Sequence, residues 1–97
     1  NKYLNPTERR EANCLATVLL QSKESIANGA RDFGLLQQQA LQILTAHGWQ
    51  PDYIAICNQR TLSPAARDDS QLVILGAARL GQTRLIDNAE LDLSAMK

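Results

Sequence analysis

His47 is the only histidine of the chain and the first side chain to consider as a general acid or base. The sequence pattern places it in the last turn of a helix. There an imidazolium is favoured by the negative helix end, and a neutral imidazole can bond to the terminal carbonyls. A catalytic role would also need a nucleophile or a carboxylate within hydrogen-bond range. We therefore favour a capping or packing role for His47 over a catalytic one.

Arg84 and Asp87 lie three positions apart in a segment that is predicted to be extended. Their side chains should therefore point to opposite faces of a strand, which argues against a direct pair. Asp87 shares its face with apolar residues (Leu85, Ala89 and Leu91). If that face packs on the core, the carboxylate must meet backbone donors or a basic partner at the sheet edge. We interpret Asp87 as a structural hydrogen-bond anchor rather than as a ligand contact.

Motifs for metal, nucleotide and hydrolase sites are not found. The acidic residues come from a loop and from both faces of a strand, without the spacing of a calcium loop (Asp68, Asp69, Asp87, Glu90 and Asp92). The glycines form neither Gly-x-x-x-x-Gly-Lys nor Gly-x-Gly-x-x-Gly. The serines lack a nucleophile elbow and a second histidine (Ser22, Ser25, Ser63, Ser70 and Ser94). We expect no metal site and no catalytic constellation within this chain.

Composition excludes several classes of protein. Ten basic residues balance ten acidic ones, so no net charge favours nucleic acid or an anionic membrane. Cys14 and Cys57 lack the spacing of a zinc or redox site, and we expect buried reduced thiols. No apolar run approaches the roughly 18 residues of a membrane span, and no secretion leader is visible, so we expect a cytoplasmic protein. The start at Asn1 without an initiator Met suggests a fragment of a longer protein.

Two helices are predicted in the first half of the chain. The first is capped by Asn5, begins near Pro6 and ends at Asn28-Gly29. Its apolar stripe is Ala12, Leu15, Ala16, Leu19 and Ile26. The second is capped by Asp32 and ended by Gly48. Its packed face is predicted to be Phe33, Leu36, Ala40, Ile43, Leu44 and His47, while Gln37, Gln38, Gln39 and Gln42 mostly face solvent.

Three strands are predicted in the second half. The first covers residues 53–57, with Ile54 and Ile56 facing the helices. Residues 58–70 read as a polar loop and as the most mobile internal segment. Residues 71–78 are apolar on both faces and therefore form a central strand, and residues 84–93 alternate enough to leave one face wet. The fold class is α+β, with two N-terminal helices packed on a small three-stranded, mostly antiparallel sheet. We expect residues 1–97 to form a single domain that buries roughly 60–65% of its unfolded surface.

The end of this sheet carries a resemblance to a known family. The apolar run from Leu72 leads through Gly81-Gln82-Thr83 into Arg84-Leu85-Ile86-Asp87-Asn88. This segment resembles the last hairpin of the pantoate-β-alanine ligases (pantothenate synthetases), which carry a similar Ala-Ala-x-Leu-Gly-x-x-Arg-Leu-Ile-Asp-Asn string. Asn1-Lys2-Tyr3-Leu4-Asn5-Pro6 is similar to the continuation of that family's Ser-Ser-Arg-Asn signature, of which only the final Asn is present. The resemblance covers nearly the whole chain and corresponds to the C-terminal domain of the family.

The resemblance implies an ATP-dependent reaction in which pantoate and ATP give pantoyl adenylate and pyrophosphate, after which β-alanine displaces AMP. It implies that ATP and Mg²⁺ serve the full-length enzyme and that the N-terminal catalytic domain is the partner of this chain. Asn1 would be the one ATP-binding residue here. The chain would be an inactive lid, with Asn1 to Asn5 as its hinge. Some relatives continue into a cytidylate kinase, and the sequence leaves such a fusion open. The alternative hypothesis is an independent protein-interaction module that uses the exposed sheet face or the loop at residues 58–70.

Overall fold

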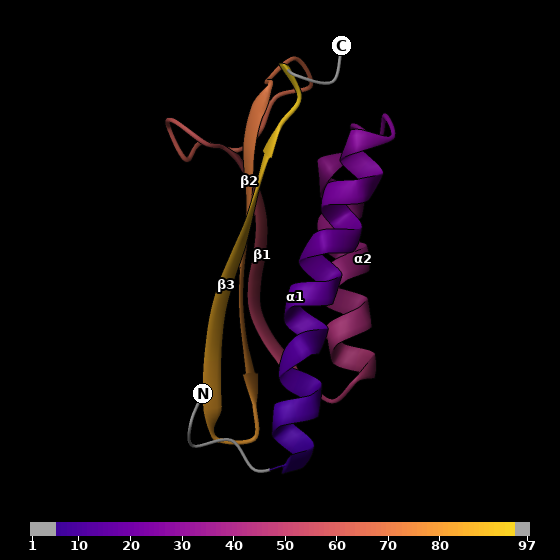
Figure 1. Cartoon of the computed structure of the whole chain (residues 1–97), viewed down its shortest axis with the longest axis vertical. Coiled ribbons are helices and arrows are strands. Elements are labelled where there is room, and N and C mark those ends of the chain that lie inside the picture. Colours follow the sequence, from indigo (N-terminus) through magenta and orange to yellow (C-terminus); the bar gives the residue numbers. More distant parts are fainter. Residues whose placement is uncertain (1–5, 95–97) are drawn as a thin grey trace.

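A computed structural model describes the backbone of residues 6–94 and the side chains of residues 13–94. Two helices precede three strands: α1 (Pro6–Ala27), α2 (Phe33–Ala46), β1 (Gln50–Asn58), β2 (Gln71–Leu80) and β3 (Thr83–Asp92). The helices lie antiparallel on one face of the sheet, as Figure 1 shows. The predicted α+β class is therefore confirmed. The predictions for Asn1 to Asn5, and those that concern the end of the chain at Lys97, lie outside the described residues.

Both helices end in the same way, at glycines with positive φ. Gly29 (φ 112°) follows α1, where Ala30 N–H donates to Ser25 O and Gly29 N–H to Ile26 O. Gly48 (φ 88°) follows α2, and the equivalent two bonds recur there. This pair of bonds satisfies terminal carbonyls and requires a left-handed residue, which glycine adopts without a steric cost. At the other end of α2, Asp32 Oδ1 accepts a 3.0 Å bond from Leu35 N–H, as its type predicted.

The sheet is antiparallel throughout, with the strand order β1-β2-β3. β2 is central, as its two apolar faces predicted. β1 extends three residues further at its start than the predicted 53–57, because pairing with β2 continues past a register shift between Pro51 and Tyr53. Proline is tolerated there since β1 is an edge strand. β2 and β3 are joined by the two-residue turn Gly81-Gln82, in which Gly81 has φ 63°.

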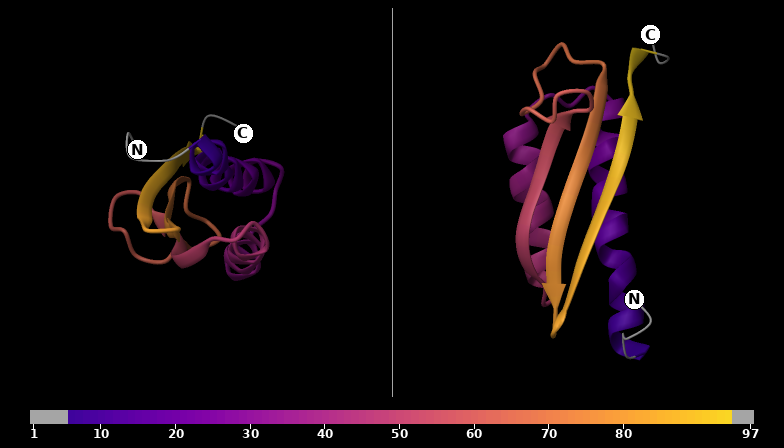
Figure 2. Two further views of the ribbon diagram at one scale, coloured as in Figure 1. Left: turned by 90° about the horizontal axis from the view of Figure 1, so that it is seen from below. Right: turned by 90° about the vertical axis from the view of Figure 1, so that its left-hand side faces the viewer.

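The core lies between the helices and one sheet face. α1 covers β2 and β3, and α2 covers β1 (Figure 2). At the closest approach, a Cβ added to Gly76 would lie 3.0 Å from Ile54 Cδ1 and 3.2 Å from both Leu15 Cδ1 and Leu19 Cδ2. The absent side chain of Gly76 therefore lets α1 pack directly on the middle of the sheet.

The predicted helix faces need corrections. On α1, Val18 and Ser22 are buried beside the predicted leucines, because this side of the helix packs against α2. On α2, Leu36, Ala40 and Leu44 are buried, but Ile43 is 37% exposed and His47 is exposed. These two positions turn from β1 towards α1, where they line a hollow between the two helices. None of the described helices is long and apolar enough to cross a membrane.

Candidate functional site

His47 occupies the C-cap of α2, where its backbone N–H donates to Ile43 O and Leu44 O, each at 3.1 Å. His47 thus lies at the end of the helix, as predicted, and its side chain is exposed. Cys57 is a buried thiol, as predicted, whereas Cys14 is only half-buried, and neither is part of a disulfide. Among residues 13–94, no group of three or more His, Cys, Asp and Glu side chains is placed to hold a metal ion.

Asp87 and Arg84 lie on opposite faces of β3, as predicted. Asp87 is half-buried on the helix-facing side, opposite Gly76, and its Oδ1 accepts a 2.8 Å bond from the backbone N–H of Asn88. This contact supports the anchor interpretation, although the donor lies at an exposed edge rather than in the core. Arg84 reaches across the sheet, and its Nε donates to Asp52 Oδ2 at 2.7 Å. The hydrogen bond and the charge of Asp52 raise the pKa of Arg84 above its usual value.

Three further acidic side chains make structural hydrogen bonds. Asp92 accepts from the hydroxyl and the backbone N–H of Ser94, and these bonds lower the pKa of the Asp92 carboxyl. Asp69 Oδ2 accepts from Ala66 N–H at 2.8 Å and closes a turn before β2. Glu90 accepts a 3.0 Å bond from the side-chain amide of Gln59. These carboxylates are exposed or half-buried and are not gathered in one place, so they provide no acid-base pair.

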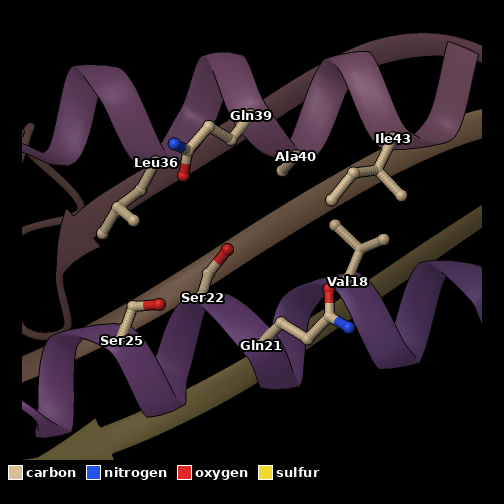
Figure 3. A pocket seen from close by; sticks show the side chains of 8 residues that line it. All are labelled: Val18, Gln21, Ser22, Ser25, Leu36, Gln39, Ala40 and Ile43. Carbon is tan, nitrogen blue, oxygen red and sulfur yellow. The ribbon is translucent and has the colours of Figure 1, made fainter.

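A groove between α1 and α2 forms a cavity of about 150 Å³ (Figure 3). Apolar side chains from both helices line it together with two hydroxyls and two amides (Val18, Gln21, Ser22, Ser25, Leu36, Gln39, Ala40 and Ile43). Figure 3 shows Val18 of α1 and Ile43 of α2 pointing towards each other across this groove. The lining contains no group that titrates near neutral pH. The groove is therefore suited to packing and hydrogen bonding but not to proton transfer.

A larger cavity of about 520 Å³ lies between α1 and β3. It is lined by Asn13, Leu15 and Ala16 of α1 and by residues 84–87 of β3. Asp87 and Arg84 thus border the same cavity although they point to different faces of the strand. Arg84, Asp87 and Asn13 contribute one cation, one carboxylate and one amide to this cavity, and the rest of its lining is apolar. Arg84 is already paired with Asp52. Among the described residues it holds no nucleophile and no histidine.

The loop at residues 58–70 is held by its own hydrogen bonds. Asn58 Oδ1 accepts from Arg60 N–H and Thr61 N–H, and Asn58 N–H donates to Ser63 O. Leu62 adopts a positive φ of 60° and is 60% exposed. Part of the loop lies along the outer edge of β1. It is held there by a β-bridge between Cys57 and Pro64 and by a hydrogen bond from Ala65 N–H to Ile56 O. The loop therefore covers a strand edge.

Three features were not anticipated from the sequence, two contacts and one buried side chain. Gln37, which was predicted to face solvent, is half-buried, and its Oε1 accepts a 2.9 Å bond from Ile56 N–H on the edge of β1. Trp49 is 2% exposed, and its indole Nε1–H has no acceptor among the described residues. The pair between Arg84 and Asp52 joins residues 32 positions apart. A tryptophan directly after a helix-ending glycine could have signalled burial, whereas the other two contacts depend on tertiary geometry.

Comparisons with known proteins agree with this arrangement. The family model described as pantoate-beta-alanine ligase matches residues 1–90. The pantothenate synthetase of Nitrosomonas europaea is 56% identical over 93 residues, which cover 96% of this chain and 34% of that protein. The pantothenate synthetase of Neisseria meningitidis serogroup C is 47% identical over 93 residues, with the same two coverages.

A crystal structure of pantothenate synthetase from Thermus thermophilus has the same fold. It matches with a TM-score of 0.81 and 30% sequence identity, over 92% of this chain and 32% of that chain. The chain thus spans about a third of the length of the relatives that it matches. Sequence and fold agree, and the chain belongs to the pantoate-beta-alanine ligase family.

Proposed function

We propose that the chain is the C-terminal lid domain of a longer cytoplasmic ligase that condenses pantoate with β-alanine to give pantothenate. One observation carries the proposal: relatives at 47–56% identity are named pantothenate synthetase, and this chain matches only about a third of them. The absence of a catalytic constellation among the described residues is consistent with a domain that assists chemistry performed elsewhere in the polypeptide.

ATP and Mg²⁺ belong to the proposed reaction, but the described residues do not fit them. The acidic side chains are dispersed among the described residues, no glycine-rich phosphate loop occurs, and the cation that borders the cavity between α1 and β3 is already paired. Asn1, the one residue expected to contact ATP, lies outside the described residues. We therefore assign the binding of ATP and Mg²⁺ to the part of the enzyme that this chain does not contain.

The role of this chain in the proposed reaction is closure. An acyl adenylate is readily hydrolysed, and a domain that covers it would exclude water until the amine of β-alanine attacks. The fold suits movement as one body, because α1, α2 and the sheet share one hydrophobic cluster. The hinge expected at Asn1 to Asn5 lies outside the described residues.

The proposal is tested on the full-length protein that contains this sequence. We expect pantothenate to form only when pantoate, β-alanine, ATP and Mg²⁺ are all present, with one AMP and one pyrophosphate released for each product. The matched control is the same protein truncated before residue 1, which should be inactive if catalysis requires the lid. A full-length protein that folds but makes no pantothenate would contradict the proposal and would favour the interaction module instead.

A further inference from the structure

A polar cavity of about 240 Å³ lies at the end of the molecule where α1 and β3 end and β2 begins (Figure 1). Four charged side chains border it, two arginines and two aspartates (Arg31, Arg67, Asp68 and Asp69). The rest of its lining is small or apolar and comes from the ends of the same three elements or from residues next to them (Ala27, Ser70 and Leu93). Neither arginine has a role in the contacts described above.

Arg31 is fixed by the carboxyl end of α1. Its Nη1 donates to Ile26 O at 2.8 Å and to Ala30 O at 2.7 Å, and the residue is half-buried. A cation is favoured at this end of a helix, where carbonyl oxygens lack helical partners. The Nε and Nη2 groups of Arg31 make no hydrogen bond with the other described residues. The guanidinium is therefore held in place while several of its donors are left for a ligand.

The other three charged residues belong to a rigid turn, residues 66–69. Asp69 N–H donates to Ala66 O at 3.0 Å, and Ala66 N–H donates to Asp69 Oδ2 at 2.8 Å. Arg67 and Asp68 occupy the two central positions of this turn, and both are exposed. Because two hydrogen bonds close the turn, its charged side chains project from a fixed backbone.

None of these four charged side chains forms an ion pair with another. An ion pair brings a side-chain nitrogen within about 4 Å of a carboxylate oxygen, and between described residues this occurs only for Arg84 and Asp52. The cavity is thus bordered by two charges of each sign. An anion alone would also meet the carboxylates, and a cation alone would also meet the guanidinium groups. A molecule that carries both charges can bind each group through its opposite.

The size of the cavity limits the ligand. A water molecule takes up roughly 30 Å³ in the liquid, so 240 Å³ holds a molecule of about eight non-hydrogen atoms. We propose that this cavity binds a small dipolar ion of the amino-acid class, with its carboxylate on Arg31 and Arg67 and its ammonium group on Asp68 and Asp69. Asp69 is able to take part because Ala66 uses only its Oδ2. A nucleotide or a polyphosphate fits neither the size of the cavity nor its balance of charge.

Methyl resonances of the full-length protein test the proposal. Alanine and leucine methyl groups are labelled with carbon-13, since Ala27 and Leu93 border the cavity. The probe is γ-aminobutyrate, and the controls are butyrate, which lacks the ammonium group, and butylamine, which lacks the carboxylate. We expect saturable shifts of Ala27 and Leu93 with γ-aminobutyrate, at an affinity about fivefold or more above that of either control. Equal binding of butyrate, or no saturable shift, would overturn the proposal.

Charge-removing variants give a second measurement. Arg67→Gln and Asp68→Asn each remove one charge from the cavity but leave the backbone bonds of the turn, which Ala66 and Asp69 make. The matched control is Arg60→Gln, an exposed position of the same loop that does not border the cavity. We expect each of the two variants to weaken γ-aminobutyrate binding about fivefold, and the control to change it less than about twofold.

Unchanged binding by folded Arg67→Gln and Asp68→Asn proteins would contradict the assigned contacts. Far-ultraviolet circular dichroism and the methyl spectrum without ligand show whether each variant is folded. The probe is γ-aminobutyrate rather than β-alanine, so the result does not depend on the proposed ligase reaction. Pantothenate formation by the parent protein is assayed separately, and the two proposals therefore fail independently.

Discussion

Gln37 is the residue whose structural role differs most from its expected one. A glutamine in the middle of a polar run is normally a solvent-facing helix residue, yet its Oε1 accepts the N–H of Ile56 on the outer edge of β1. Ile56 is only 2% exposed, so its N–H would otherwise lie near the core without a partner. The side chain of a helix thus completes the hydrogen bonding of an edge strand, which also hinders pairing with another chain.

We predict that Gln37→Ala lowers the free energy of unfolding by about 1–2 kcal/mol, because it leaves the Ile56 N–H unsatisfied. Gln37→Glu keeps an acceptor and should recover most of the loss. The neighbouring Gln38→Ala is the control, since Gln38 is exposed, and should change stability by less than about 0.5 kcal/mol. Urea unfolding of the purified variants measures all three. Equal losses for Gln37→Ala and Gln38→Ala would contradict the role assigned to this bond.

Asp87 gives the second prediction for a single residue. Its carboxylate accepts one backbone bond, from Asn88 N–H at an exposed strand edge, rather than several buried ones. We therefore expect Asp87→Ala to destabilise the domain by about 0.5–1.5 kcal/mol, and Asp87→Asn, which retains an acceptor, by less. Thermal unfolding of the purified chain checks the order of the two variants. If both variants melt like the parent while the full-length enzyme loses turnover, Asp87 acts on substrate and the anchor interpretation is wrong.

At the scale of elements, the predictions that succeeded rest on local signals. The sequence correctly predicted the cap at Asp32, the helix ends at Gly29 and Gly48, and the two apolar faces of β2. In each case the residues that carry the signal lie within a few positions of the structure that they determine. The sequence did not predict the exposure of Ile43 or the contact between Gln37 and β1. Both depend on how α2 is rotated against the sheet, and a helical pattern does not fix that angle. The pair between Arg84 and Asp52 was not predicted either, because it crosses three strands and depends on their tertiary arrangement.

The packing of α1 against β2 depends on the missing side chain at Gly76. The three nearest atoms to an added Cβ are tips of Ile54, Leu15 and Leu19, all within 3.2 Å. We predict that Gly76→Val pushes α1 off the sheet and destabilises the domain by about 1–3 kcal/mol. The control is Gly34→Ala on the exposed side of α2, where an added Cβ meets only Asp32 Oδ1 at 3.7 Å.

Gly34→Ala should stabilise the domain by up to about 1 kcal/mol, since alanine favours the helical backbone. Melting temperatures of the two variants should therefore move in opposite directions. A Gly76→Val protein as stable as the parent would show that α1 can shift away from β2 without loss, and the close contact would then be incidental.

At the scale of the whole molecule, the chain combines a complete core with an incomplete site. One cluster of buried side chains joins both helices to all three strands, so the parts needed for folding are present. The sequence contains one histidine and no phosphate-binding motif, and it therefore predicted no catalytic constellation within this chain. The sequence also predicted that the domain is an accessory to a larger protein. It did not predict which residues of the three strands share a row, since the register of the strands must be known before Tyr53, Ala77 and Ile86 fall into one row.

The last prediction follows from this combination: the isolated chain folds by itself but does not catalyse the ligase reaction. A cluster that includes Leu15, Leu44, Ile56 and Ile74, all at most 2% exposed, should give one cooperative transition in thermal unfolding, with a stability of about 5–10 kcal/mol. Pyrophosphate release from ATP and pantoate should stay at the background rate of a denatured sample. A broad, non-cooperative transition would show that the domain needs the rest of the polypeptide to fold. Pantoate-dependent pyrophosphate release by the purified chain would show that the assignment of ATP binding to the upstream part is wrong. The two halves are independent, because stability depends on the helix-facing side of the sheet and activity depends on groups that this side does not contain.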